Sequence, residues 1–571
     1  MRTTKSFTLM LAFSLALVLL NAIPAAWSQE VTAAVVGTVS DPSGAPIKGA
    51  TVTARDVERG TAWTAETNGT GDFTILRLPI GTYTAEATAP GFEKAAYPRF
   101  TLVLNQTARL EFKMKVGQVS ETIEVTGAAP ILQTQDAQVG TVINNVVSEN
   151  VPLLTRNYGE LTLLTPGAVS TNPAAFTSGQ NTFQVGRPYI NGNREQTSNY
   201  ILDGIDNNQH DNNEVAYSPS PDAIQEFNLI TQNPSAEFGN FLGGILNVSF
   251  KSGTNSFHGS AFEFLRNDKF NANSWYNPGD TAKGTLRFNQ FGATFGGPII
   301  KNRLFFFLDY QATRNPNGTT PTIQVMSANE RAGDFGELCT GAGGTFDGSG
   351  TCSSPAGQLY APQAGVDPTL RAPVPNNNLP AAGLTLSSIA TSIVNSPLYP
   401  SPNVTGTNLL NYSQRTLNSA DQGDAKIDWT PNEKDHFFGR YTQQSVRNPT
   451  TETFLLAKNG FTDNNYPLKN GVLDWAHTLS PTMINDFRVG FSYFPVSQGF
   501  TNPPGVDFSI PGATTSFLPS MQGLFGNVAT IGNNLSAFNV FADTVIQVGD
   551  SFLKTHGNHD FRAGFQFNRY R

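Results

Sequence analysis

Apolar and polar residues alternate with a period of two through the second half of the chain. The pattern is clearest at 425–430, 487–493 and 561–568. Strands of this kind carry one apolar and one polar face, so we predict an antiparallel β region from 256 to 571, with about nine strands. The apolar face suits the core of a soluble sandwich or the lipid side of a membrane barrel, and alternation alone does not separate the two.

Short β-prone runs separated by turns also fill residues 31 to 115. The runs are 35–39, 50–54, 73–75 and the turn-and-strand unit 78–87. Asp41-Pro42-Ser43-Gly44 and the Gly-rich stretch 68–72 are strong turn signals. Several short strands at this spacing predict a small β-sandwich.

Between these regions, residues 131–255 mix helical and strand signals. A short helix is expected within 139–154. An apolar strand over 199–202 ends in Asp203-Gly204, and a helix–strand unit is expected at 223–227. Three further glycines, Gly239, Gly243 and Gly244, precede a strand at 245–248. Glycine clusters of this kind mark turns and close backbone approaches, so this segment predicts a compact α/β domain.

Composition favours an exported β protein. Of 571 residues, 14% are charged and 39% hydrophobic, with 41 Phe, 53 Gly and 36 Pro. Few charges with many aromatics and turn formers are typical of an outer-membrane or extracellular β protein. The formal net charge of −8 argues against a nucleic-acid partner, which requires a basic face.

The first 28 residues have the features of a signal peptide. Arg2 and Lys5 precede the apolar run 7–20, and Ala26 and Ser28 are small residues at the positions a signal peptidase reads. We predict cleavage after Ser28. The alternative, an uncleaved membrane anchor, is disfavoured because a spanning helix needs about 20 apolar residues.

The two cysteines, Cys339 and Cys352, lie in one Gly/Ser/Thr-rich stretch. In an oxidising compartment two nearby loop cysteines usually pair, so we predict a disulfide. Zinc is the alternative, but no His or second Cys pair lies near them. The surrounding interval, 315–414, lacks a strand pattern and is expected to be a long extracellular loop; 496–533 is expected to be a second one.

Residues 29–117 resemble the carboxypeptidase regulatory-like domain. The resemblance rests on GTVSDPSGAPIKGATVTA, on DFTILRLPIGTYTAEA and on the closing Ala89-Pro90-Gly91-Phe92. It implies a transthyretin-like sandwich that serves as a binding module or as a spacer. The module has no catalytic machinery, so no peptidase activity is implied.

Residues 118–130, QVSETIEVTGAAP, follow the sandwich as a strand-prone run and a linker. The run Glu121, Thr122, Ile123, Glu124, Val125 and Thr126 resembles the box that outer-membrane receptors present to the energising protein TonB. An extended segment can pair with the edge of a partner's sheet. The alternative is a last sandwich strand followed by a plain linker.

The order of motifs in 131–255 resembles the plug domain of TonB-dependent receptors, in which a similar strand ends in an Asp-Gly turn. The leading sandwich, Asn289-Gln290-Phe291-Gly292 and Gly296-Gly297-Pro298-Ile299 narrow the resemblance to Oar-like receptors. The resemblance implies a mainly β protein: a sandwich, an α/β plug and the first part of an antiparallel transmembrane β-barrel. Receptors of this type have roughly 22 strands, so we expect the chain to be a C-terminally truncated fragment.

The sequence contains no convincing catalytic constellation. His210 lies in an Asx-rich run, 206–213, whose oxygens could hold calcium, but the order is not that of an EF-hand and Asx-rich turns explain it. No nucleophile elbow, zinc-protease or phosphate-loop motif occurs. We therefore expect no enzyme activity, no cofactor and no metal.

The resulting hypothesis is an Oar-like TonB-dependent receptor of the bacterial outer membrane. It implies energised uptake of an unidentified extracellular ligand, with a TonB-type protein and outer-membrane lipid as partners. One alternative is an outer-membrane adhesin or surface-assembly binding protein without transport. Another is a soluble secreted β protein.

Overall fold

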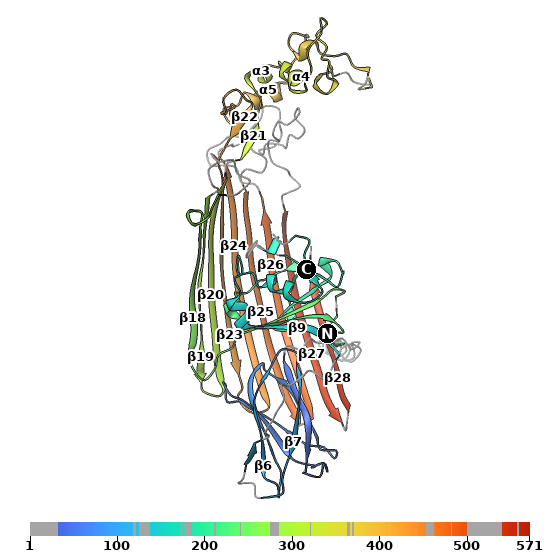
Figure 1. Cartoon of the computed structure of the whole chain (residues 1–571), viewed down its shortest axis with the longest axis vertical. Coiled ribbons are helices and arrows are strands. Elements are labelled where there is room, and N and C mark those ends of the chain that lie inside the picture. Colours follow the sequence, from blue (N-terminus) through green and yellow to red (C-terminus); the bar gives the residue numbers. More distant parts are fainter. Residues whose placement is uncertain are drawn as a thin grey trace, which may run out of the picture.

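The computed structural model describes most of the chain, in the ranges 32–117, 122–124, 137–172, 175–176, 186–210, 213–239, 241–273, 285–319, 321–362, 366–367, 370–452, 462–480, 482–499, 539–556 and 559–571. The predicted signal peptide and most of the expected loop at 496–533 lie outside these residues. Figure 1 shows three parts: a small β domain at one end of a tall curved sheet, a mixed domain against that sheet, and a cap of helices and loops at the far end.

The small β domain is a sandwich of two sheets, ordered β4-β1-β7 and β3-β2-β5-β6-β8. Its strands are β1 (Ala33–Ser40), β2 (Thr51–Asp56), β3 (Ala62–Glu66), β4 (Asp72–Leu78), β5 (Gly81–Thr88), β6 (Lys94–Leu102), β7 (Thr107–Lys113) and β8 (Thr122–Glu124). The side chains that alternate inward form one apolar core, which includes Val35, Val52, Tyr83, Leu110 and Phe112. The period-two pattern of 31–115 is thus satisfied by burying the apolar face.

The mixed domain is built on a five-stranded sheet, ordered β13-β12-β17-β16-β9, with β12 parallel to β17. Its elements are β9 (Val139–Asn144), α2 (Asn145–Asn150), η1 (Tyr158–Leu164), β10 (Ala168–Val169), β11 (Tyr189–Ile190), η3 (Glu195–Thr197), β12 (Asn199–Leu202), β13 (Ile205–Asp206), β14 (Asn208–Gln209), β15 (Glu214–Val215), η4 (Pro221–Ala223), β16 (Ile224–Gln232) and β17 (Ile245–Phe250). The expected helix within 139–154 is α2, whose first turn is capped by the Asn144 side chain.

The tall sheet has nine antiparallel strands in sequence order. They are β18 (His258–Asn267), β19 (Thr285–Ile300), β20 (Leu304–Thr319), β23 (Gln414–Trp429), β24 (Asp435–Glu452), β25 (Thr462–Ser480), β26 (Met483–Gln498), β27 (Asn539–His556) and β28 (His559–Tyr570); η5 (Asp268–Phe270) follows β18. The connections at the sandwich end are short, such as 301–303 and 430–434, and those at the other end are long. Short turns on one side and long loops on the other are typical of outer-membrane barrels.

The faces of the tall sheet are inverted relative to a soluble protein. Many residues buried against the mixed domain are polar, such as Asn470, Gln422 and Thr442. An apolar patch of the same face, which includes Phe307 and Leu468, joins the core of the mixed domain. The exposed outer face carries Ile427, Leu473 and further large apolar side chains: Phe291, Phe295, Leu308, Tyr310, Trp429, Tyr441, Trp475, Phe487, Phe491, Tyr493, Ile546, Phe561 and Phe567. This arrangement fits a wall whose outer face meets lipid, and it separates the two alternatives that alternation left open.

The interval 315–414 differs from the expected irregular loop. Strands β20 and β23 extend into it as far as Thr319 and from Gln414. Between them lie β21 (Thr322–Gln324), α3 (Ala328–Arg331), α4 (Gly336–Gly341), η6 (Pro355–Gly357), η8 (Pro375–Asn377), α5 (Ser388–Val394) and β22 (Leu409–Asn411). These elements enclose a small apolar core that includes Val325, Phe335 and Tyr399. Short elements around scattered apolar residues leave no period to detect, which is why the sequence pattern missed them.

Candidate functional site: the interface between the mixed domain and the barrel wall

The Asp203-Gly204 motif forms the hairpin turn between β12 and β13. Both residues have positive φ, +46° and +81°, as a two-residue type I′ hairpin turn requires. The turn points at the inner face of the wall. There the Gly204 carbonyl accepts hydrogen bonds from Arg488 Nη1 and Gln547 Nε2, each at 3.3 Å.

Glycine is favoured at position 204 by its φ of +81° and by the neighbouring Arg488 side chain. A Cβ built there would lie 1.8 Å from Arg488 Nη1, far inside van der Waals contact. Gly204 therefore serves both the positive φ and the close approach to the wall. The sequence motif marks a contact point between two domains as well as a turn.

Asp203 forms a buried ion-pair triad with two strands of the wall. Its carboxylate lies 3.3 Å from Lys426 Nζ on β23 and 2.9 Å from Arg440 Nε on β24. The Phe250 backbone N–H donates to the same carboxylate at 3.1 Å. Burial alone would raise the pKa of Asp203, but Lys426 and Arg440 outweigh burial and hold that pKa below its usual value. The carboxylate is thus held ionised.

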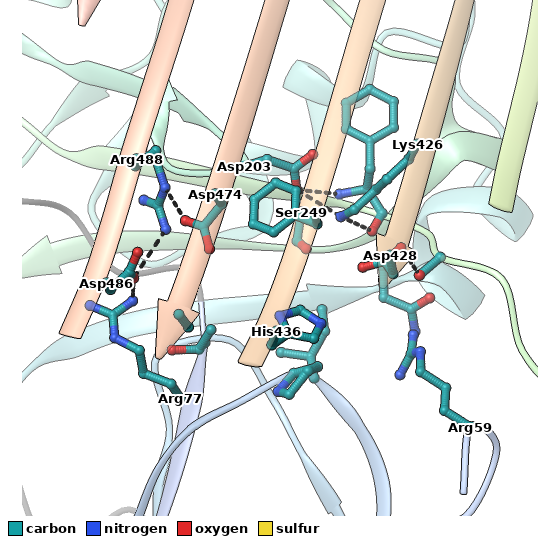
Figure 2. A pocket seen from close by; sticks show the side chains of 18 residues that line it. Arg59, Arg77, Asp203, Ser249, Lys426, Asp428, His436, Asp474, Asp486 and Arg488 are labelled. Atoms are coloured by element: carbon teal, nitrogen blue, oxygen red, sulfur yellow. Dashed lines mark hydrogen bonds and ion pairs between the residues drawn. The ribbon is translucent and has the colours of Figure 1, made fainter. Parts of the chain in front are cut away.

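A polar cavity of about 70 Å³ lies beside this triad, where the sandwich, the mixed domain and the wall meet (Figure 2). Four cationic side chains line it: Arg59, Arg77, Lys426 and Arg488. Four carboxylates and one imidazole join them: Asp203, Asp428, Asp474, Asp486 and His436. The cavity therefore belongs to a charge-balanced network rather than to an apolar ligand pocket.

Arg488 is central to this network. Its side chain is buried and lies 2.6 Å from Asp474 and 3.6 Å from Asp486. Arg77 of the sandwich forms an ion pair with the same Asp486. Charged residues at the depth of a membrane wall persist only when they face the interior and are paired. This network can fix the domains in position, and nothing in it provides a nucleophile with an adjacent base.

The predicted glycines do not all gather at this site. Gly243 and Gly244 lie at the opposite end of the sheet from Asp203, where Gly243 N–H donates to the Thr197 carbonyl at 2.9 Å. A Cβ on Gly244 would meet Ile190 at 3.0 Å, so close packing explains this glycine. The Gly239 carbonyl accepts from Asn199 Nδ2 at 3.3 Å near the same end.

The box-like segment is described only from Thr122 to Glu124, as β8. It pairs in parallel with β6, with Ile123 opposite Ala95, and is an edge strand of the sandwich sheet. Glu121, Val125 and Thr126 lie outside the described residues. This placement fits the alternative of a last sandwich strand, and it also leaves one strand edge open to a partner.

Cys339 and Cys352 form a disulfide, with the Cα atoms 5.8 Å apart. They belong to the cap of helices and loops at the end of the wall far from the sandwich. His210 packs against Tyr570, with ring centroids 4.3 Å apart, and lies 3.4 Å from Asp206. Among the described residues no group of three His, Cys, Asp or Glu could hold a metal ion.

Sequence reasoning missed most of this site. Lys426, Arg440, Asp474 and Arg488 each occupy a polar position in an alternating strand, and nothing local distinguishes them from solvent-facing residues. The signal was the occurrence of full charges inside strands whose other face is strongly apolar. Within the described ranges, no helix is both long and apolar enough for a membrane span.

Comparison with known proteins matches two domain families. The family model described as "Outer membrane beta barrel domain" matches residues 249–571, and the model described as "Carboxypeptidase regulatory-like domain" matches residues 34–115. The descriptions of the barrel family and of the relative Oar name a membrane barrel and a transporter, and neither names an enzyme.

Three individual proteins are similar over part of their length. The TonB-dependent transporter Oar of Myxococcus xanthus is 29% identical over 332 residues, covering 54% of this chain and 29% of Oar. S-layer protein B of Metallosphaera sedula is 28% identical over 162 residues, covering 28% of this chain and 35% of that protein. The crystal structure of the outer membrane transporter YddB from Escherichia coli aligns with a TM-score of 0.44 at 10% identity, covering 76% of this chain and 48% of YddB. The chain thus spans less than half the length of each.

Proposed function

The chain belongs to the outer membrane β-barrel domain family and lies in the bacterial outer membrane; from this premise we propose that it is a TonB-dependent receptor. In this proposal the mixed domain is a plug inside the barrel, and an extracellular ligand enters when the plug is displaced. The proposal rests on the similarity to Oar and on one structural observation: the inner face of the wall, with its polar side chains and one apolar patch, packs against the mixed domain.

The Asp203 triad supports this role for the plug. A buried carboxylate with two cationic partners holds the plug and the wall in one register, beside the apolar core that the plug and the wall also share. Tyr217 of the plug also donates to Asp424 of β23 at 2.5 Å. These directional polar contacts, together with the shared apolar core, suit a plug that is held in one position at rest.

Energy would enter through the segment 121–126. A partner strand would add to the open edge of β8, so that main-chain hydrogen bonds carry the pull. The short turns and the sandwich would face the periplasm, where a TonB-type protein reaches them. The long connections, including the disulfide-bonded cap, would face outward and meet the ligand.

Strand addition at this segment can be tested with purified full-length protein and the periplasmic domain of a TonB-type protein. Ile123→Pro removes a backbone donor and should abolish co-purification. Ala129→Pro, in the adjacent linker, is the matched control and should retain it. If the partner does not bind the unmodified receptor, or binds Ile123→Pro equally well, the energised-transport proposal fails.

Surface assembly is the second candidate, favoured by the similarity to S-layer protein B. In that case the barrel would anchor a surface layer and the box would be dispensable. Deleting residues 121–126 separates the two candidates in cells. Loss of ligand accumulation with intact surface binding supports transport, whereas unchanged accumulation with a defective cell-surface layer supports assembly.

A further inference from the structure

The sandwich is seated against both the plug and the barrel wall. Figure 1 shows it directly beneath the short-turn end of the wall, and Figure 2 shows Arg59 and Arg77 reaching from it toward wall carboxylates. We define the clamp surface as the sandwich residues that make these contacts and those described next: Ala34, Glu58, Arg59, Leu76, Arg77, Leu104 and Asn105.

Arg77 contacts the wall from a backbone position that suits glycine. Its φ is +58°, inside strand β4, at an irregularity in the pairing of β1 with β4 next to Ala33 and Val35. Such a bulge re-aims side chains out of the sheet, and an L-residue with this φ is strained. The redirected guanidinium pairs with Asp486 and donates to Ser551 Oγ at 2.6 Å. The ion pair with Asp486 and the hydrogen bond to Ser551 offset the strain of the positive φ at Arg77.

Apolar contact accompanies this ion pair. Leu76 and Ala34 pack against Leu553 of β27, with Ile484 of β26 beside them. The Leu76 and Leu553 side chains are 8% and 2% exposed. The bulge thus sends two successive residues, one apolar and one charged, into the same strands of the wall.

The same surface also holds the plug. The Leu104 N–H donates to the Glu226 carboxylate of β16, and Asn247 Nδ2 of β17 donates to Asn105 Oδ1 at 3.2 Å. At its edge, Asn255 donates to the carbonyls of Glu58 and Arg59, at 3.0 and 2.8 Å, and to Asn302 of a short turn at 2.7 Å. The clamp surface therefore contacts both the plug and the wall, which must separate if the plug moves.

We propose that the clamp surface is a docking surface whose partner is the barrel mouth of the same chain, and that the docked sandwich clamps the plug to the wall. A pull on the chain between β8 and β9 loads the sandwich, because β8 pairs with β6, and it also loads the plug, which begins at β9. The sandwich is bonded to the plug through Leu104 and Asn105 and to the wall through Arg77, so it holds the plug against this pull. The clamp must open before the plug leaves. This order of events rests on the proposed function; the docking itself does not.

Arg77→Gly tests the docking without harming the sandwich, because glycine tolerates the positive φ at no cost. In the full-length protein, spin labels at Lys113→Cys in the sandwich and Glu433→Cys on a short turn report the distance between sandwich and wall. The parent protein should give one narrow distance distribution, and Arg77→Gly a broad one. Arg99→Ala, an exposed arginine on β6, is the control and should stay narrow.

Charge exchange separates a specific contact from general damage. Arg77→Asp and Asp486→Arg should each broaden the distribution, and the double variant should narrow it again. The proposal is overturned if Arg77→Gly leaves the distribution narrow, or if the double variant is no narrower than either single variant.

A cross-link tests the order of opening without ligand or energising protein. A short bismaleimide joins Glu58→Cys to Asn302→Cys, and single molecules are pulled by a handle on residues 125–130. The linked protein should lose the plug-release step that the unlinked protein shows; a monofunctional maleimide should leave it. Release at the same force with the link in place would disprove the clamp, while the TonB-binding experiment would stand unaffected.

Discussion

The sandwich and the barrel wall use the same period-two alternation for opposite purposes. In β2 of the sandwich the apolar Val52 and Ala54 are fully buried, whereas in β25 of the wall the apolar Leu473 is 66% exposed and the polar Asn470 is fully buried. Strand geometry is common to both, since successive side chains alternate between faces. Only the surroundings differ: the sandwich has water outside, and the wall has lipid outside and the plug, with its polar contacts, within. The comparison shows that periodicity fixes the faces of a strand but not which face is the interior.

The largest expected effect tests the polar interior of the wall. Asp203→Ala leaves Lys426 and Arg440 buried without their counter-charge, which should cost about 3–5 kcal/mol of plug stability. Urea unfolding of the full-length protein, followed by a probe in the plug, measures the change. Asp463→Ala, which removes an exposed ion pair with Arg447, is the control and should change the unfolding free energy far less. Equal losses would mean that the triad does not hold the plug.

Apolar truncation should distinguish the two regions. Leu110→Ala empties part of the sandwich core and should cost about 2–5 kcal/mol. Leu473→Ala removes the same atoms from the outer face of the wall, where lipid fills the space, and should cost much less. Thermal unfolding of each variant in the same membrane mimetic gives both values. A Leu473 variant as damaging as the Leu110 variant would argue that its side chain lies in a protein core.

An arginine introduced on the outer, apolar face of the wall should destabilise the protein more than one introduced on the inner face. Phe565 pairs with Asp550 on the outer face of β28, and Gln566 faces inward beside Gly549. Phe565→Arg should cost about 2–4 kcal/mol if it lies near the membrane midplane, and Gln566→Arg much less. Fluorescent labels at the two positions provide the membrane test. Lipid-borne quenchers should reach position 565 and not 566, and equal quenching would remove β28 from the barrel.

The smallest expected effect, counted per pH unit, is the change in docking stability with pH at the contact between sandwich and plug. Burial raises the pKa of Glu226 to about 8, although the Leu104 N–H works in the opposite direction. The docked form therefore holds a proton that the undocked form releases above its ordinary pKa of 4.5. Docking should be fully stable below that value and weaken as pH rises toward 8, by at most about 1.4 kcal/mol per pH unit.

The spin-label distance between sandwich and wall, recorded from pH 4 to 9, measures this dependence. Glu226→Gln keeps the shape of the side chain and cannot ionise, so its distribution should not change with pH. A parent protein whose docking is strongest at high pH would contradict the assignment of a buried, protonated Glu226.

Several features could be predicted from the sequence for local reasons. Strand faces follow from the alternation, and the sandwich follows from turn residues at short intervals. The resemblance to Oar-like receptors, based on the sandwich motifs, the Asp-Gly turn and the start of the barrel, is confirmed by the two matched families and by Oar itself. The boundaries proposed for the domains and the role of residues 121–126 stay predictions.

The tertiary structure alone decided which charges matter. Asp203 is local to its turn, but its partners Lys426 and Arg440 are more than two hundred residues away, and their positions in the strands look like any solvent-facing positions. The cap over 321–413 and the docking of Arg77 were also invisible, because neither depends on a periodic pattern. The alternation in the sequence determined two faces for every strand. The plug, by filling one side of the wall with polar groups that need partners, determined which face is inside, since a buried charge is stable only where another chain segment supplies its counter-charge.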